Sequence, residues 1–329
     1  LTPVDFTLSL TPKTTLPQWK KEYKNLHPSL WYNKYDGLQL GLNLNGNYFG
    51  KDNFYDLKVF YNSRLGQDGN NINSLRKDNN IPVSFEFKAK QRLKRVARGL
   101  FANEWYNFNA GILNTGLGLE KTFRKQDTRN PEYRKVFINT KYLVNSNNAN
   151  HQKEYLLNPN EWSVSESITN KGKWEDDNIN ASINFGFEEK YKYGTGFGTY
   201  KISVRTPGAF GTHNYTFAQI EGINSFKTLK KLDIKTRVFG RIGTSAPSES
   251  MLNLAGANQE EMLNNDFTKA DAFIPTQWLG YGAETNHFQM GGGLNLRGYA
   301  GYLAPEVNND EIYYTYKSNS GMSASMEID

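Results

Sequence analysis

The chain has 329 residues, a net charge of +6 and no cysteine, so disulfide frameworks and thiolate metal sites are excluded. Apolar residues make up 37% of the chain, but aromatic residues reach 14%, which excludes a simple disordered polymer. Lysine and arginine alternate with acidic residues, unlike the dense basic footprint of a nucleic-acid-binding protein.

Residues 1–36 are predicted to be a lead or linker ahead of a β domain. From 37 to 46, Leu38, Leu40, Leu42 and Leu44 alternate with glycine, glutamine and asparagine. This period of two is typical of a strand with one apolar and one polar face. Similar segments follow in chain order: 54–64, 82–95, 106–124, 133–145, 161–169, 178–188, 197–206, 214–224 and 231–242.

Two all-β folds give this pattern. A soluble sandwich alternates because one face of each sheet is buried, whereas a membrane barrel alternates because one face meets lipid and the other lines a lumen. Sandwich strands are commonly about 5–6 residues long, and these are about twice that length, as tilted membrane strands are. Aromatic residues near the strand ends resemble the girdles of membrane barrels: Tyr48, Phe49, Trp105, Tyr106, Tyr142, Trp162, Tyr191 and Tyr193. The pattern favours a transmembrane antiparallel β-barrel over a sandwich.

The alternation stops between 243 and 320 and resumes in the final stretch "GMSASMEID". A loop of this length inside a compact domain is expected only where it has a function. Near its end stands "GGGLNLRGYAGY", in which three glycines precede an arginine. Glycine permits backbone conformations closed to other residues, so the loop tip is predicted to fold back and present Arg297.

These residues carry a resemblance to a family. A β-barrel with a long late loop and the tip Leu296-Arg297-Gly298-Tyr299, followed by a small-residue strand ending at Glu327, resembles the BamA/TpsB-type bacterial surface antigen superfamily. The resemblance implies sixteen strands, of which about twelve are present here, and a loop inserted into the lumen. It also implies a location in the outer membrane of a Gram-negative cell, with residues 1–36 as a periplasmic or interfacial lead. Residues 37–329 would then be a barrel domain that is incomplete at its C-terminus, with 243–320 as its long loop.

The number of strands before the long loop must be odd if the chain enters from the periplasm. Ten segments alternate clearly, so one strand is predicted to be missed. We expect the missing strand either within 65–81 or within 96–124, where two strands are then counted as one.

The sequence gives little sign of catalysis or of a cofactor. The histidines His27, His151, His213 and His287 are scattered, and no HExxH spacing joins them. The glycine run lacks the lysine and hydroxyl residue of a phosphate loop, so we expect no enzyme activity, no cofactor and no metal. The pairs Glu260-Glu261 and Asp176-Asp177 are interpreted as solvated loop carboxylates. In "KAKQRLKRVAR", Lys88, Lys90, Arg92 and Lys94 share one face of a strand, which favours a lumen wall or a rim facing lipopolysaccharide over a nucleic-acid site.

Arg297 is the candidate site residue. The hypothesis is that glycines Gly291, Gly292 and Gly293 turn the loop tip into the lumen and Tyr299 packs it there. Glu327, with Ser323 and Ser325 on the polar face of the last strand, is the proposed acidic partner of Arg297. A solvated loop arginine is the alternative.

Three functions stay open. The resemblance implies a part in outer-membrane protein insertion or in protein translocation, with outer-membrane lipid, lipopolysaccharide and other outer-membrane or periplasmic proteins as partners. The first alternative is a barrel anchor for a larger protein whose other domain, for example a peptidase, acts in the periplasm or at the surface. The second alternative is a passive pore, which a plugging loop argues against.

Overall fold

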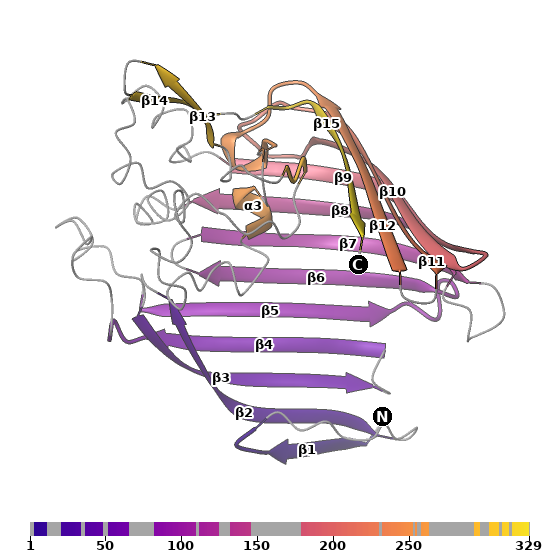
Figure 1. The fold of residues 1–329 in the computed structure, drawn as a ribbon. Coiled ribbons are helices and arrows are strands. Elements are labelled where there is room, and N and C mark those ends of the chain that lie inside the picture. Colours follow the sequence, from indigo (N-terminus) through magenta and orange to yellow (C-terminus); the bar gives the residue numbers. More distant parts are fainter. Residues whose placement is uncertain are drawn as a thin grey trace.

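The structure is a computed structural model of the chain (Figure 1). It describes residues 3–11, 21–33, 37–48, 52–65, 82–109, 112–124, 132–145, 179–229, 232–252, 254, 258–262, 293–296, 303–308, 311–315 and 318–328. In this part of the chain no helix is long and apolar enough to cross a membrane.

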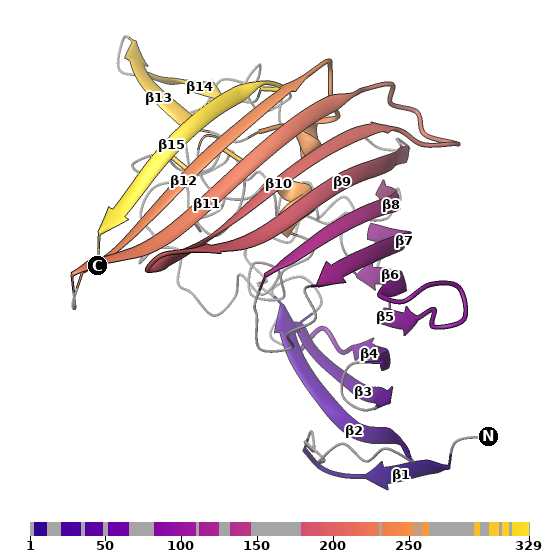
Figure 2. The same cartoon turned by 90° about the vertical axis from the view of Figure 1, so that its right-hand side faces the viewer.

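The fold is all-β, with one sheet of thirteen strands that follow one another in chain order except at its end. Twelve strands pair antiparallel, and β1 (Val4–Leu8) pairs parallel with β2. The antiparallel strands are β2 (Glu22–Asn33), β3 (Gly37–Tyr48), β4 (Asp52–Asn62), β5 (Val83–Arg92), β6 (Leu100–Asn109), β7 (Ile112–Arg124), β8 (Tyr133–Asn145), β9 (Ile179–Tyr193), β10 (Gly196–Pro207), β11 (Phe217–Leu229), β12 (Leu232–Gly243) and β15 (Gly321–Ile328). The sheet is curved but not closed into a barrel (Figure 2).

The described parts of the segment between β12 and β15 hold four short elements. These are the 3-10 helix η2 (Ser248–Ser250), the helix α3 (Gln259–Met262) and the hairpin of β13 (Leu303–Asn308) and β14 (Glu311–Thr315). The sequence prediction of a long loop over 243–320 therefore overlooked this hairpin. The prediction that alternation resumes as a strand after residue 320 is confirmed by β15, which pairs with β12.

Among the described residues, eleven antiparallel strands precede this segment, which is an odd number, as predicted. The merging of two strands within 96–124 is confirmed, because β6 and β7 lie there. A further strand, β2, lies within the predicted lead of 1–36 and pairs with β3 along its whole length, so the sheet starts before residue 37. The segments 66–81 and 161–169 lie outside the described residues.

The two faces of the sheet have opposite chemistry. Register places Leu40 opposite Leu30 and Tyr61, and all three side chains are exposed. We call this side the convex face; its exposed apolar residues include Leu42, Val59, Leu117, Leu119, Val136, Ile138, Phe185, Ile202, Val204, Ile220, Val238, Met322 and Met326. Ile183 and Ile234 share this face in half-buried positions.

The opposite, concave face buries polar side chains: Asn25, His27, Gln39, Asn43, Asn62, Ser84, Glu86, Asn107, Asn114, Asn180, Ser182, Ser203 and Arg241. Hydrogen bonds across strands satisfy part of this set. Gln39 Nε2 donates to Asn62 Oδ1 at 2.7 Å, and Asn62 Nδ2 donates to Ser84 Oγ at 2.9 Å. Such pairing removes the cost of burying a polar group. The exposed convex face is therefore apolar, whereas the concave face buries these polar side chains together with Phe60, Ile112, Phe137, Leu143, Phe217 and Phe239.

Glycines allow large aromatic rings to lie flat across neighbouring strands. Phe137 pairs directly with Gly186, and a Cβ atom added at Gly186 would lie 2.1 Å from the Phe137 ring. Trp105 covers Gly116 in the same way. These aromatic–glycine pairs leave no space for a methyl group.

Gly186→Ala is expected to lower the free energy of unfolding by about 1–3 kcal/mol, because the ring of Phe137 must move. Gly222→Ala is the matched control, since no atom lies within 4 Å of the place that its new methyl group would take. Thermal unfolding in detergent measures both variants. Equal losses at the two glycines would contradict the packing described here.

Candidate functional site

The candidate site is a buried charged cluster that joins the segment after β12 to the concave face. We define the Glu260 cluster as Lys141, Asn180, Arg205, Glu249, Ser250 and Glu260. Lys141 stands on β8, Asn180 on β9 and Arg205 on β10, whereas the other three residues belong to η2 and α3. Residues more than a hundred positions apart in the chain therefore meet at one place.

Glu260 lies at the centre of the cluster. Its Oε1 accepts a hydrogen bond from Lys141 Nζ at 2.7 Å, and its Oε2 accepts one from Arg205 Nη1 at 2.8 Å. Ser250 Oγ also donates to Oε2. Its side chain is only 6% exposed. The interpretation of Glu260 as a solvated loop carboxylate is thus wrong, because two cations from distant strands compensate its burial.

A second part of the cluster binds η2. Asn180 Nδ2 donates to Glu249 Oε1 at 2.7 Å and to Ser250 Oγ at 2.9 Å. Asn180 Oδ1 accepts from the hydroxyl of Tyr215 at 2.8 Å, and Tyr215 is almost fully buried. One asparagine on the wall thereby fixes two residues of η2 and the connection between β10 and β11.

The start of α3 is held by a reciprocal cap. The Glu261 amide donates to Asn258 Oδ1 at 2.9 Å, and the Asn258 amide donates to Glu261 Oε2 at 3.1 Å. This is the capping-box arrangement that satisfies the first free amides of a helix. It orients the short helix so that Glu260 points at the wall.

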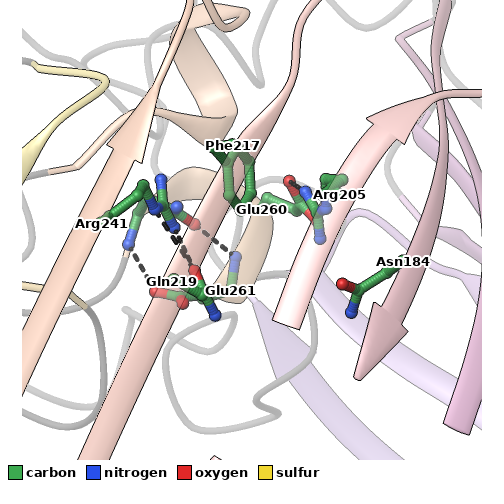
Figure 3. A pocket seen from close by; sticks show the side chains of 8 residues that line it. Asn184, Arg205, Phe217, Gln219, Arg241, Glu260 and Glu261 are labelled. Atoms are coloured by element: carbon green, nitrogen blue, oxygen red, sulfur yellow. Dashed lines mark hydrogen bonds and ion pairs between the residues drawn. The ribbon is translucent and has the colours of Figure 1, made fainter. Parts of the chain in front are cut away.

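A polar cavity borders the cluster (Figure 3). Arg241 on β12 closes one side of it, donating to Ser250 O at 2.8 Å and to Gln219 Oε1 at 3.1 Å. Its guanidinium group also lies 4.1 Å from the centre of the Phe217 ring. The cavity is lined by Asn184, Arg205, Phe217, Gln219, Arg241, Asn258, Glu260 and Glu261.

The glycine run reaches the wall at a second place. Gly293 O accepts from Arg237 Nη2 at 2.9 Å, and Arg237 Nε donates to Glu221 Oε1 at 2.7 Å. A Cβ atom added at Gly293 would lie 2.2 Å from a methyl group of Leu252. Any larger residue here would force the buried Leu252 side chain to shift.

An apolar cluster supports this second contact. Leu252, Leu254 and Leu294 pack with Phe239 of β12, and Leu296 packs against them. Leu296 N donates to Leu254 O at 2.7 Å. The residue that immediately precedes Arg297 is therefore fixed near the concave face.

The predicted site residues fall partly outside this description. Arg297, Gly298, Tyr299, Gly291 and Gly292 lie outside the described residues, so the pairing of Arg297 with Glu327 stays a prediction. Glu327 lies on the concave face of β15, where register sets it opposite Lys235. Among the described residues, no group of three His, Asp or Glu side chains is placed to hold a metal ion.

No family model matches the sequence, and no curated protein matches it. What the site does must therefore be argued from its geometry. The geometry can hold a segment across the inner side of a curved sheet by a buried carboxylate, two cations and an apolar contact.

Breaking the ion pairs should release the segment. Glu260→Ala strands Lys141 and Arg205, and Arg205→Ala weakens the same contact; each should cost about 3–5 kcal/mol. The double variant should cost much less than the sum of the two, measured as loss of thermal stability and faster protease cleavage after β12. The exposed pair Lys227–Asp233 is the control, at about 0–1 kcal/mol. Additive losses for Glu260 and Arg205 would show that they are not partners.

The pH dependence follows from the ionisation of Glu260. Burial opposes its charge, but Arg205 and Lys141 outweigh burial and hold the pKa of Glu260 well below its ordinary value of 4.5. A lowered folded-state pKa contributes stability that is present above the unfolded value and is lost as pH falls through the folded value. Protease resistance after β12 should thus be constant from pH 7 down to about 4.5 and fall only in stronger acid. A loss already between pH 7 and 5 would contradict this assignment.

Proposed function

We propose that the chain forms the wall and plug of an outer-membrane β-barrel that takes part in protein insertion or translocation, as the resemblance to the BamA/TpsB superfamily implies. The observation that carries the proposal is the sheet that exposes apolar residues on its convex face while the segment after β12 is bound to its concave face. An apolar outer face with polar groups on the inner face is the arrangement of a membrane wall.

The apolar convex face supports a lipid environment. Leu117 and Val238 are more than half exposed, and neighbours of the same kind continue across the strands. Continuous exposed apolar surface of this kind is rare on soluble monomers. A membrane strand, by contrast, is apolar toward lipid and polar toward the barrel interior.

The two rims of the sheet support an orientation. At one rim, called here the short-turn rim, the connections are 49–51, 93–99, 125–132, 194–195 and 230–231. The opposite rim carries the longer connections 63–82, 146–178, 208–216 and 244–320, although 34–36 and 110–111 are short. Membrane barrels have short periplasmic turns and longer extracellular loops, so the short-turn rim is assigned to the periplasm.

Aromatic and basic side chains on the convex face support the same placement. At the short-turn rim, Lys24 lies 5.8 Å from the ring centre of Tyr55, and Lys94 lies 5.4 Å from that of Tyr48. Tyr191 and Tyr193 form a further aromatic pair at this rim. Such side chains suit a membrane interface, where rings sit at the headgroup level and lysine reaches toward water.

The attachment of the segment between β12 and β15 to the concave face favours a regulated path over a passive pore. The Glu260 cluster and the Gly293 contact bind the segment to β8, β9, β10 and β12. A segment fixed across the inner face restricts flow through a barrel. A client protein can still pass where two strands of the wall separate, or through the interior after the segment is released.

Proteoliposomes that contain the full chain should speed the insertion of an unfolded outer-membrane client protein and should conduct few ions. Glu260→Gln should raise the ion conductance, because the plug loses its central contact, and the client folding rate should change with it. Asp233→Asn, at an exposed pair away from the plug, is the control. High conductance of the unaltered protein would indicate a pore, and low conductance with no effect on the client would indicate an anchor.

A further inference from the structure

The loop between β5 and β6 presents a group of cations at the short-turn rim. It carries Lys94, Arg95 and Arg98 as exposed cations around Val96, which is 73% exposed. The sequence pattern placed Lys94 with Lys88, Lys90 and Arg92 on one strand face. The structure separates them, since β5 ends at Arg92 and Lys94 lies in the loop.

The loop has a defined conformation. Leu93 O accepts hydrogen bonds from the amides of Val96 at 3.1 Å and Ala97 at 3.2 Å, and Leu93 N donates to Leu100 O at 2.9 Å. Gly99 has a φ of 76° and accepts from Thr122 N at 2.9 Å, which attaches the loop to the end of β7. A Cβ atom at Gly99 would lie 2.4 Å from Thr122 O. The cations are therefore presented by an ordered turn.

The loop also points to the side that the proposed function assigns to lipid. In Figure 2 the loop after β5 extends outward from the convex face of the sheet. Lys94 at its base lies over Tyr48 on the same convex side. The loop therefore has an apolar residue between cations and extends outward from a rim with aromatic residues. This arrangement suits the boundary between the acyl chains and the headgroups of a bilayer.

We propose that residues 94–98 form an interfacial anchor that binds the phosphate groups of anionic phospholipids in the periplasmic leaflet. Arg95 and Arg98 contact the phosphates, and Val96 enters the acyl boundary. Arginine suits this role because its planar fork binds phosphate through two hydrogen bonds. The proposal rests on the proposed function, because it requires the convex face to meet lipid.

The absence of cysteine allows a single label to test it. The full chain carrying Val96→Cys, labelled with an environment-sensitive fluorophore, is placed in vesicles of phosphatidylcholine with phosphatidylglycerol. The label should be shielded from water and quenched more by brominated phosphatidylglycerol than by brominated phosphatidylcholine at equal content. A label at Thr195→Cys, in the turn between β9 and β10, should stay in water.

The charge variants give the second measurement. Near an anionic surface each basic residue is worth about 1 kcal/mol, or about fivefold in binding. Arg95→Gln with Arg98→Gln should therefore remove most of the preference for phosphatidylglycerol. Lys192→Gln with Lys227→Gln removes the same charge from the concave side of the same rim and should leave the preference unchanged.

A label at Leu117→Cys separates the two possible failures. If it is in water, the proposed function fails and this inference fails with it. If it is in lipid while the label at position 96 is in water, the anchor alone is wrong. Equal quenching by the two lipids, or equal losses in both pairs of charge variants, would also overturn the assignment of phosphate binding to Arg95 and Arg98.

Discussion

The structure depends on the alternation of side chains along hydrogen-bonded strands. Because successive side chains point to opposite faces, one register fixes both the apolar convex face and the polar concave face of each strand. A shift by one residue would place Leu40 opposite Ser29 or Trp31 instead of Leu30, and would turn the hydrogen-bonded Gln39 to the exposed face. The covered polar face, the exposed apolar face and the contacts of the segment after β12 all follow from this one constraint.

The second requirement is that the buried negative charge of Glu260, on the segment after β12, is compensated by cations of the sheet. A carboxylate buried like Glu260 is costly unless cations and hydrogen bonds replace water. Lys141 and Arg205 supply both, from strands that are adjacent in the sheet only through β9. Docking of the segment therefore requires that β8, β9 and β10 are correctly paired.

Much of the sheet could be predicted from sequence because its strands show a period of two. Strand β3 has leucine at every second position and was found with its faces correctly assigned. Strand β2 was missed because Pro28 interrupts it and its polar residues include His27 and Asn25. The turn between β6 and β7 could be inferred only from the parity of the strands, because just residues 110–111 separate two apolar runs. Glu260 could not be recognised, since nothing in "NQEEML" reveals partners on β8 and β10.

The central claim is that the convex face meets lipid while the concave face does not. It is tested most directly by spin labels placed one at a time along β7, from Ile112 to Arg124, in the full chain reconstituted in vesicles. Accessibility to oxygen, which is enriched in lipid, should then alternate with a period of two. It should be high at Leu117 and Leu119 and low at Asn114 and Gly116, which are buried on the concave face. Uniform accessibility along the strand, or high accessibility of Leu117 to a water-soluble nickel reagent, would contradict the account.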